Sequence, residues 1–138
     1  MTKVERFYIG PQIATATTKS ESSAAGVPVI TVTRANGMAW TNGVVSTDPE
    51  TGEYVAGDIR VQTRRVLENL KLGLHKAGTS FDRVVMVHSF LRDMNDWPGY
   101  HEIYSQYFDH NNPPPRYTVR AEMADPRWLL EIHMTAVV

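Results

Sequence analysis

The sequence predicts an α+β sandwich of one sheet backed by two helices, with the elements in the order ββαβαββ. Three observations lead to this prediction: β-branched runs alternate with segments of helical period, turn residues separate them, and the chain has 138 residues. A chain of this length buries enough surface for a self-sufficient core. We therefore expect one domain over residues 1–138, with an irregular N-terminal segment.

Residues 27–34 and 38–45 are the first two predicted strands. The first is rich in β-branched residues, and Asn36-Gly37 after it is a strong signal for a two-residue hairpin turn. Residues 13–25 precede them and consist mostly of Thr, Ser and Ala. We expect that segment to be mobile or to form an irregular edge.

The first helix is predicted over residues 58–77. Residues 46–57 contain turn signals, after which Asp58 can cap the helix, and Gly78 is a natural C-cap. Apolar residues recur at spacings of three, four and seven and predict one buried stripe, formed by Ile59, Val66, Leu67, Leu70, Leu74 and Ala77.

A central strand is predicted over residues 83–92, because this segment is rich in β-branched and apolar residues. Asn95 or Asp96 can then cap a second helix, whose first turn tolerates Pro98. This helix carries an aromatic stripe made of Trp97, Tyr100, Tyr104, Tyr107 and Phe108. Such a stripe is typical of core packing, and we interpret it in that way.

A second hairpin is predicted at the C-terminal end. Residues 111–115 are Asn-Asn-Pro-Pro-Pro, which ends the helix and gives a stiff approach to Arg116. Strands are expected over residues 117–123 and 129–138, with a turn at 124–126.

Composition excludes several classes of function. Lys and Arg number 14 against 15 Asp and Glu, and no basic cluster occurs, which argues against a nucleic-acid partner. The chain has no cysteine, so a thiol nucleophile is absent and an intracellular, cytoplasmic location is expected. Neither a secretory signal nor an apolar run long enough to span a membrane is evident.

Metal-dependent and nucleotide-dependent chemistry are not expected either. The histidines lack close ligand spacing, no glycine-rich phosphate loop occurs, and no serine lies in a nucleophile elbow. We expect neither a metal nor a cofactor.

The last two predicted strands carry the candidate chemistry. Alternate residues of a strand share a face, which groups Arg116 with Thr118 and Arg120, and Glu131 with His133 and Thr135. If these strands pair as a hairpin, the Arg116 cation and the Glu131 carboxylate share one face. This arrangement can be a plain cross-strand salt bridge, or a guanidinium beside a general base that takes a carboxylate-bearing substrate.

Six segments, in the same order and spacing, resemble the Rid family of imine and enamine deaminases, also called the YjgF family. The likeness covers roughly residues 35–138 and is carried by NGMAWTNGVVSTDPETGE (36–53), DIRVQTRRVLENL (58–70), FLRDMNDW (90–97), YHEIYSQYF (100–108), PPRYTV (114–119) and LLEI (129–132).

The resemblance implies a chorismate-mutase-like fold with one mixed sheet, assembled as a homotrimer with cofactor-free active sites between subunits. It implies hydrolysis of 2-imino acids or their enamine tautomers to 2-oxo acids and ammonium. By resemblance, Arg116 clamps the substrate carboxylate, the Gly43 amide assists it, and Glu131 activates the attacking water. A fixed guanidinium and a positioned base are sufficient to catalyse this hydrolysis, because imines are intrinsically electrophilic.

The cleft wall departs from the family pattern. Thr118 stands where many members have cysteine, His101 where they often have asparagine, and Asn42 in place of the usual serine. Val44 replaces a glutamine, and a wall tyrosine has no match. These changes put the standard small substrates in doubt.

Several stretches look most like 2-aminomuconate deaminases, whose substrate is an unsaturated amino dicarboxylate. Arg120, about 13 Å along the strand from Arg116, can meet a distal carboxylate, to which His101 or His133 can hydrogen-bond. Alternatively Arg120 pairs with Glu122 or Glu131 or lies in solvent. A different class of function also stays open, a module that binds small carboxylates without turnover.

Overall fold

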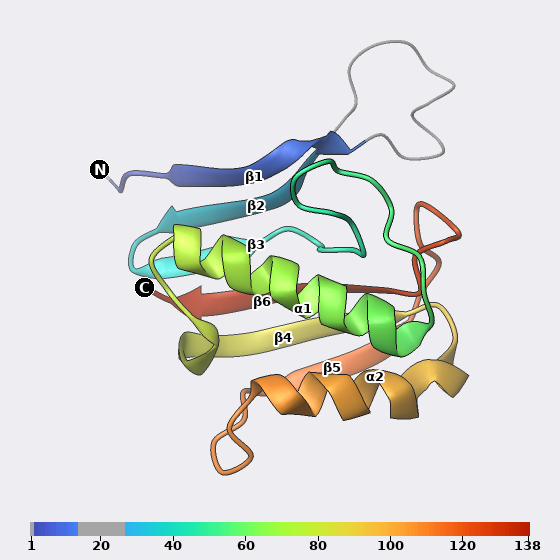
Figure 1. The fold of residues 1–138 in the computed structure, drawn as a ribbon. Coiled ribbons are helices and arrows are strands. Elements are labelled where there is room, and N and C mark those ends of the chain that lie inside the picture. Colours follow the sequence, from blue (N-terminus) through green and yellow to red (C-terminus); the bar gives the residue numbers. More distant parts are fainter. Residues whose placement is uncertain (1, 14–26) are drawn as a thin grey trace.

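The computed structural model describes residues 2–13 and 27–138 (Figure 1). Its strands are β1 (Glu5–Ile13), β2 (Val27–Ala35), β3 (Met38–Thr41), β4 (Val84–Leu91), β5 (Arg116–Arg120) and β6 (Leu130–Val137). Its α-helices are α1 (Ile59–Lys76) and α2 (Trp97–Tyr104). Short 3-10 turns are η2 (Phe81–Arg83), η3 (Met94–Asp96) and η4 (Ser105–Tyr107).

The strands form one mixed sheet in the order β1-β2-β3-β6-β4-β5. All neighbours are antiparallel except β4 and β5, which are parallel. Figure 1 shows α1 and α2 on the same face of this sheet. The predicted α+β class, with one mixed sheet backed by two helices, is confirmed.

Strand β1 was not predicted and adds a strand before the expected first one. It pairs with β2 from Glu5 opposite Arg34 to Ile13 opposite Val27, with an irregularity between Ile9 and Gln12. Its sequence is interrupted by Gly-Pro, so its own alternation is weak and the neighbouring strand supplies its hydrogen bonds. Residues 13–25 are the segment expected to be mobile or irregular. Apart from Ile13, this segment lies outside the residues that the structure describes.

The first hairpin and the first helix are confirmed. Asn36 and Gly37 have φ values of +50° and +74°, the left-handed pair that a type I′ turn requires. The Asp58 side chain accepts a hydrogen bond from the Val61 amide at 3.0 Å and caps α1. The returning strand β3 is shorter than predicted, because the chain leaves regular pairing after Thr41.

The predicted second hairpin is wrong. Strand β5 does not pair with β6; it pairs in parallel with β4 and forms an edge of the sheet. Strand β6 instead lies between β3 and β4. The reason is the crossover through α2, because a helix that joins two strands brings the second one back parallel to the first.

The core lies between the sheet and the helices. Leu67, Leu70, Leu130 and Ile132 are fully buried there. Two members of the aromatic stripe of α2, Tyr100 and Tyr104, join this core, whereas Trp97, Tyr107 and Phe108 pack partly buried against it. The core interpretation of the stripe is confirmed, and three of its rings also contact Arg116.

Candidate functional site

Arg116 and Glu131 lie on opposite faces of the sheet. Arg116 is opposite Val87 of β4, and Val87 is fully buried beneath the helices. Glu131 is opposite Phe90, three residues further along β4 and therefore on the other face. The expectation that the guanidinium and the carboxylate share a face is wrong, because it depended on the hairpin that does not form.

The first half of the candidate site, termed the Glu131 half-site, consists of Glu131 and Gly43 on the uncovered face. Val44 and Ile132 exchange two backbone hydrogen bonds of 2.8 and 3.1 Å, which hold the Gly43 segment beside β6. A Cβ atom on Gly43 would lie 2.1 Å from the Glu131 Oε1 atom. The carboxylate therefore occupies space that only glycine leaves open.

The polar groups of the Glu131 half-site lack partners within the described part of the chain. The Gly43 amide donates to no acceptor there, and no donor there bonds the Glu131 carboxylate. Glu131 is half-buried, and burial raises the pKa of its carboxyl above the ordinary value. A carboxyl of this kind suits proton transfer nearer neutral pH.

A row of titratable side chains continues from Glu131 across the uncovered face. The His133 ring stacks on His88 of β4 with centroids 4.1 Å apart, and His88 Nδ1 hydrogen-bonds to the Tyr117 hydroxyl of β5. Burial, and then the neighbouring His88, lower the pKa of His133. Sequence reasoning missed His88 and Tyr117, because only the strand order places them beside His133.

The second half, termed the Arg116 half-site, lies on the helix face at the start of β5. The Arg116 Cζ atom is 4.3 Å from the ring centroid of Tyr104, 5.5 Å from that of Tyr100 and 5.9 Å from that of Trp97. These contacts are cation–π interactions and hold the guanidinium against α2. The helical spacing of the aromatic residues was the available signal, but it indicates core packing equally well.

His101 completes the Arg116 half-site. Its Nδ1 atom is 3.2 Å from Nη1 and 3.3 Å from Nη2 of Arg116. Its ring stacks on Trp97 with centroids 4.6 Å apart and planes 14° apart. Burial, followed by the charges of Arg116 and His110, lowers the pKa of His101, so its neutral form is favoured.

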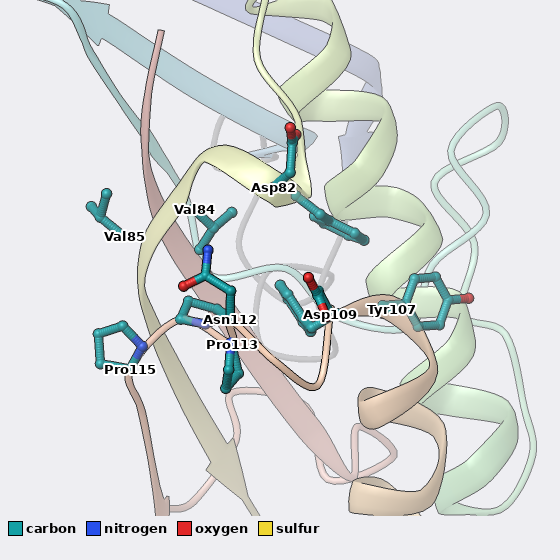
Figure 2. Close-up of a pocket in the computed structure, with 11 residues that line it drawn as sticks. Asp82, Val84, Val85, Tyr107, Asp109, Asn112, Pro113 and Pro115 are labelled. Carbon is teal, nitrogen blue, oxygen red and sulfur yellow. The ribbon is translucent and has the colours of Figure 1, made fainter.

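A cavity of about 490 Å³ opens beside Arg116 and is lined also by His101, Tyr104 and His110. A second cavity, of about 390 Å³, shares Phe108 and Asp109 with it (Figure 2). The second cavity contains none of the predicted site residues. In Figure 2 the Asp82 side chain points away from Asp109, so the two carboxylates do not converge on one ligand.

The remaining predicted residues lie at different places. Asn42 is held in the fold, because its Oδ1 atom accepts from the Thr31 amide at 3.0 Å. Thr118 is half-buried opposite Ser89, on the same side of β5 as Arg116. Arg120 is exposed at the far end of β5, and it forms no ion pair with any residue that the structure describes.

Within residues 2–13 and 27–138, no group of three or more His, Asp or Glu side chains is placed to hold a metal ion. None of the helices in the described part is both long and apolar enough to cross a membrane.

Three comparisons relate the chain to known proteins. The family described as Endoribonuclease L-PSP matches residues 19–138. A 3-aminoacrylate deaminase RutC of Acinetobacter baylyi is 35% identical over 111 residues, which are 80% of this chain and 87% of the relative. A RutC family protein of Pyrococcus abyssi is 49% identical over 71 residues, 51% of this chain and 56% of the relative.

The fold is also found in solved structures. The structure of a Rid family protein of unknown function, YyfA from Yersinia pestis, has a TM-score of 0.76 at 29% identity. The match covers 97% of this chain and 100% of that protein. These relatives support the wider resemblance and give no support to the 2-aminomuconate branch.

Proposed function

The chain belongs to the Endoribonuclease L-PSP family, which includes the Rid (YjgF) and RutC proteins, and on this premise we propose that it is a hydrolytic imine and enamine deaminase. The observation that carries the proposal is the Glu131 half-site. A half-buried carboxyl with a raised pKa lies against a glycine whose amide is unused among the described residues. The activity named for the Acinetobacter baylyi relative, 3-aminoacrylate deamination, supports the same class of chemistry.

The proposed reaction balances without a cofactor. For a 2-imino acid, Glu131 takes a proton from water, and the oxygen bonds to the imine carbon while the nitrogen gains a proton. The carbinolamine then loses ammonia as the hydroxyl proton leaves, which gives a 2-oxo acid. An enamine first accepts a proton at carbon, and a carboxyl with a raised pKa is suited to supply it. Arg116 holds the substrate carboxylate through the planar fork of its guanidinium.

We also propose a homotrimer with active sites between subunits, in which Arg116 of one subunit faces Gly43 and Glu131 of its neighbour. The support is the division of the two half-sites between opposite faces of one sheet. The uncovered face also carries large exposed side chains, namely Tyr8, Trp40, Tyr117 and Val119. An apolar face of this kind is typical of an interface with another copy.

For the substrate we propose an unsaturated amino dicarboxylate such as 2-aminomuconate, in preference to the imine of alanine. The exposed Arg120 lies on the same side of β5 as Arg116, so it can meet a distal carboxylate. A cytoplasmic location accompanies this proposal and rests on the absence of cysteine.

A second candidate function is binding of small carboxylates without turnover. It is favoured by the fact that the Arg116 half-site is complete within one chain, whereas Glu131 lies on the other face. A chain that failed to assemble would keep the guanidinium and its aromatic surroundings but would have no base beside them.

An amino-acid oxidase that generates 2-imino acids in situ tests the activity. Semicarbazide captures the imino acid that survives, so a deaminase lowers the yield of semicarbazone. We expect the wild type to lower it, Arg116→Lys to lose about 10²-fold in rate because lysine is a point charge, and Glu131→Gln to lose about 10²–10⁴-fold. Arg60→Lys, an exposed arginine on α1, and Glu50→Gln, an exposed turn residue, are the matched controls.

The outcomes separate the two functions. A wild type that binds 2-oxobutyrate but accelerates the loss of no imine favours the binding module.

The substrate proposal has its own test. The value of kcat/KM on 2-aminomuconate should exceed that on the imine of alanine, and it should fall in Arg120→Ala but not in Arg60→Ala. A larger value on the small imine, unchanged by Arg120→Ala, rejects the dicarboxylate proposal.

A further inference from the structure

We propose that His101 is a positioning residue, which sets the orientation of the Arg116 guanidinium and leaves one edge of it free for the substrate carboxylate. This inference rests on the proposed function, because it concerns the carboxylate clamp of the same site. It assigns His101 a role through Arg116 in place of the direct contact with substrate that the sequence suggested.

The geometry of the contact supports a positioning role. Both terminal nitrogens of Arg116 approach the single Nδ1 atom of His101, at 3.2 and 3.3 Å. The guanidinium edge between Nη1 and Nη2 is therefore directed to the imidazole, with one hydrogen of each nitrogen. The other edge, between Nε and Nη2, remains for a ligand. Its two parallel N–H groups match the two oxygens of a carboxylate.

The imidazole is itself fixed by its surroundings. Trp97 stacks on the His101 ring at 4.6 Å, and both residues come from α2. Tyr104, one turn further along, holds the guanidinium from another side, with its centroid 4.3 Å from Cζ. Trp97, His101 and Tyr104 thus present one rigid surface to Arg116, which begins β5 after three prolines.

The contact requires a particular protonation state. Arg116 can only donate, so His101 Nδ1 has to accept, and the ring must be the neutral tautomer with its proton on Nε2. Protonation of Nδ1 converts the acceptor into a donor and places a second cation against the first. The orientation of Arg116 is then lost, although its charge remains.

The cationic groups that face His101 act in the same direction. Arg116 faces it from β5, and His110 lies across the cavity from the segment that follows α2. Tyr104 and Asp109 line the same cavity, and Tyr100 lies on α2 beside Arg116. Glu102, the adjacent residue, is engaged by Arg60 at 2.6 Å. Burial and the cations together favour the neutral ring.

The test compares His101→Ala with His101→Asn in the full-length protein. Asparagine places Oδ1 where histidine has Nδ1, accepts the same hydrogen bonds and does not titrate. We expect His101→Ala to bind 2-oxobutyrate about tenfold more weakly by calorimetry, and His101→Asn to stay within about threefold of the wild type. His75→Asn, an exposed histidine on α1, is the matched control and should not change binding.

The pH dependence of ligand affinity distinguishes a positioning role of His101 from a purely structural one. Wild-type affinity for 2-oxobutyrate should fall as the pH decreases through the pKa of His101, and His101→Asn should lack this loss. Unchanged binding in His101→Ala overturns the inference, as does binding in His101→Asn as weak as in His101→Ala. Tighter wild-type binding on acidification that is lost in His101→Asn also overturns it, because a cationic His101 would then contact the ligand directly. A wild type that neither binds 2-oxobutyrate nor turns over an imine contradicts the proposed function itself.

Discussion

Glu131 and Gly43 constrain each other sterically. The carboxylate fills the space where a side chain at position 43 would be, 2.1 Å from the ideal Cβ position. A methyl group at position 43 would therefore displace the Glu131 carboxylate, which is the end of a flexible side chain.

A double-mutant cycle measures this constraint. Gly43→Ala should destabilise the protein by about 1–3 kcal/mol in urea unfolding, since the carboxylate has to move. In the Glu131→Ala background the same substitution should cost much less, which gives a coupling free energy above about 0.5 kcal/mol. Equal costs in both backgrounds would show that Glu131 does not occupy that space.

The raised pKa of Glu131 predicts a conflict between activity and stability. The folded state binds the proton more tightly than the unfolded state, so ionisation of Glu131 removes stability as the pH rises through its folded pKa. Glu131→Gln should therefore raise Tm at pH 7–8 by about 1–3 °C, a modest gain because solvent screens a half-buried group. The gain should vanish near pH 4, where both states are protonated, and scanning calorimetry at the two pH values checks it. An equal gain at both values would assign it to packing.

Helix α1 and strand β2 determine how closely the helical layer approaches the sheet. Gly73 lies within α1, and a Cβ atom there would be 2.5 Å from Cγ2 of Ile30. The helix rests on the sheet at this point with no space for a side chain. The packing of the two elements thus overrides the low helix propensity of glycine.

Gly73→Ala tests the packing of these two elements. Alanine gains about 1 kcal/mol of helix propensity, but overpacking against Ile30 should cost about 1–3 kcal/mol, so we expect no stabilisation and a net loss of up to about 2 kcal/mol. Leu72→Ala, at an exposed position of the same helix, is the control for propensity alone. A Gly73→Ala variant that is more stable than the wild type by chemical denaturation would show that the layers can separate.

The whole molecule presents two half-sites that a single sheet cannot bring together. The proposed trimer predicts a mass about three times 15.6 kDa by light scattering. The monomer mass at micromolar concentration would contradict it.

Mixed subunits test whether Arg116 and Glu131 act across an interface. Arg116→Ala and Glu131→Gln are each expected to be inactive, and refolding them together should restore activity. If each site takes Arg116 from one subunit and Glu131 from its neighbour, random mixing leaves about one quarter of the sites intact. Co-refolded subunits as inactive as the separate variants would mean that both residues come from the same chain.

Much of the fold could be predicted from local patterns. Asn36-Gly37 determines a hairpin because both residues adopt positive φ readily, and the spacing from Ile59 to Ala77 determines an amphipathic helix that begins after Asp58. The family resemblance was the signal that singled out Arg116, Gly43 and Glu131 as candidate site residues. Strand β1 was missed, since Gly10-Pro11 breaks its pattern and its pairing with β2 is a contact between segments distant in the chain.

The sequence by itself determined the α+β class, the two helices, most of the strands and the family, because each depends on residues close together in the chain or on a preserved order of motifs. Only the tertiary structure decided which strands are neighbours. The α2 crossover makes β5 parallel to β4, and β6 enters between β3 and β4. This order places Arg116 against α2 and Glu131 on the uncovered face, although alternation along each strand was predicted correctly. Strand pairing is a long-range property, and the face on which a side chain lies is set by its register with a neighbour that the local sequence does not specify.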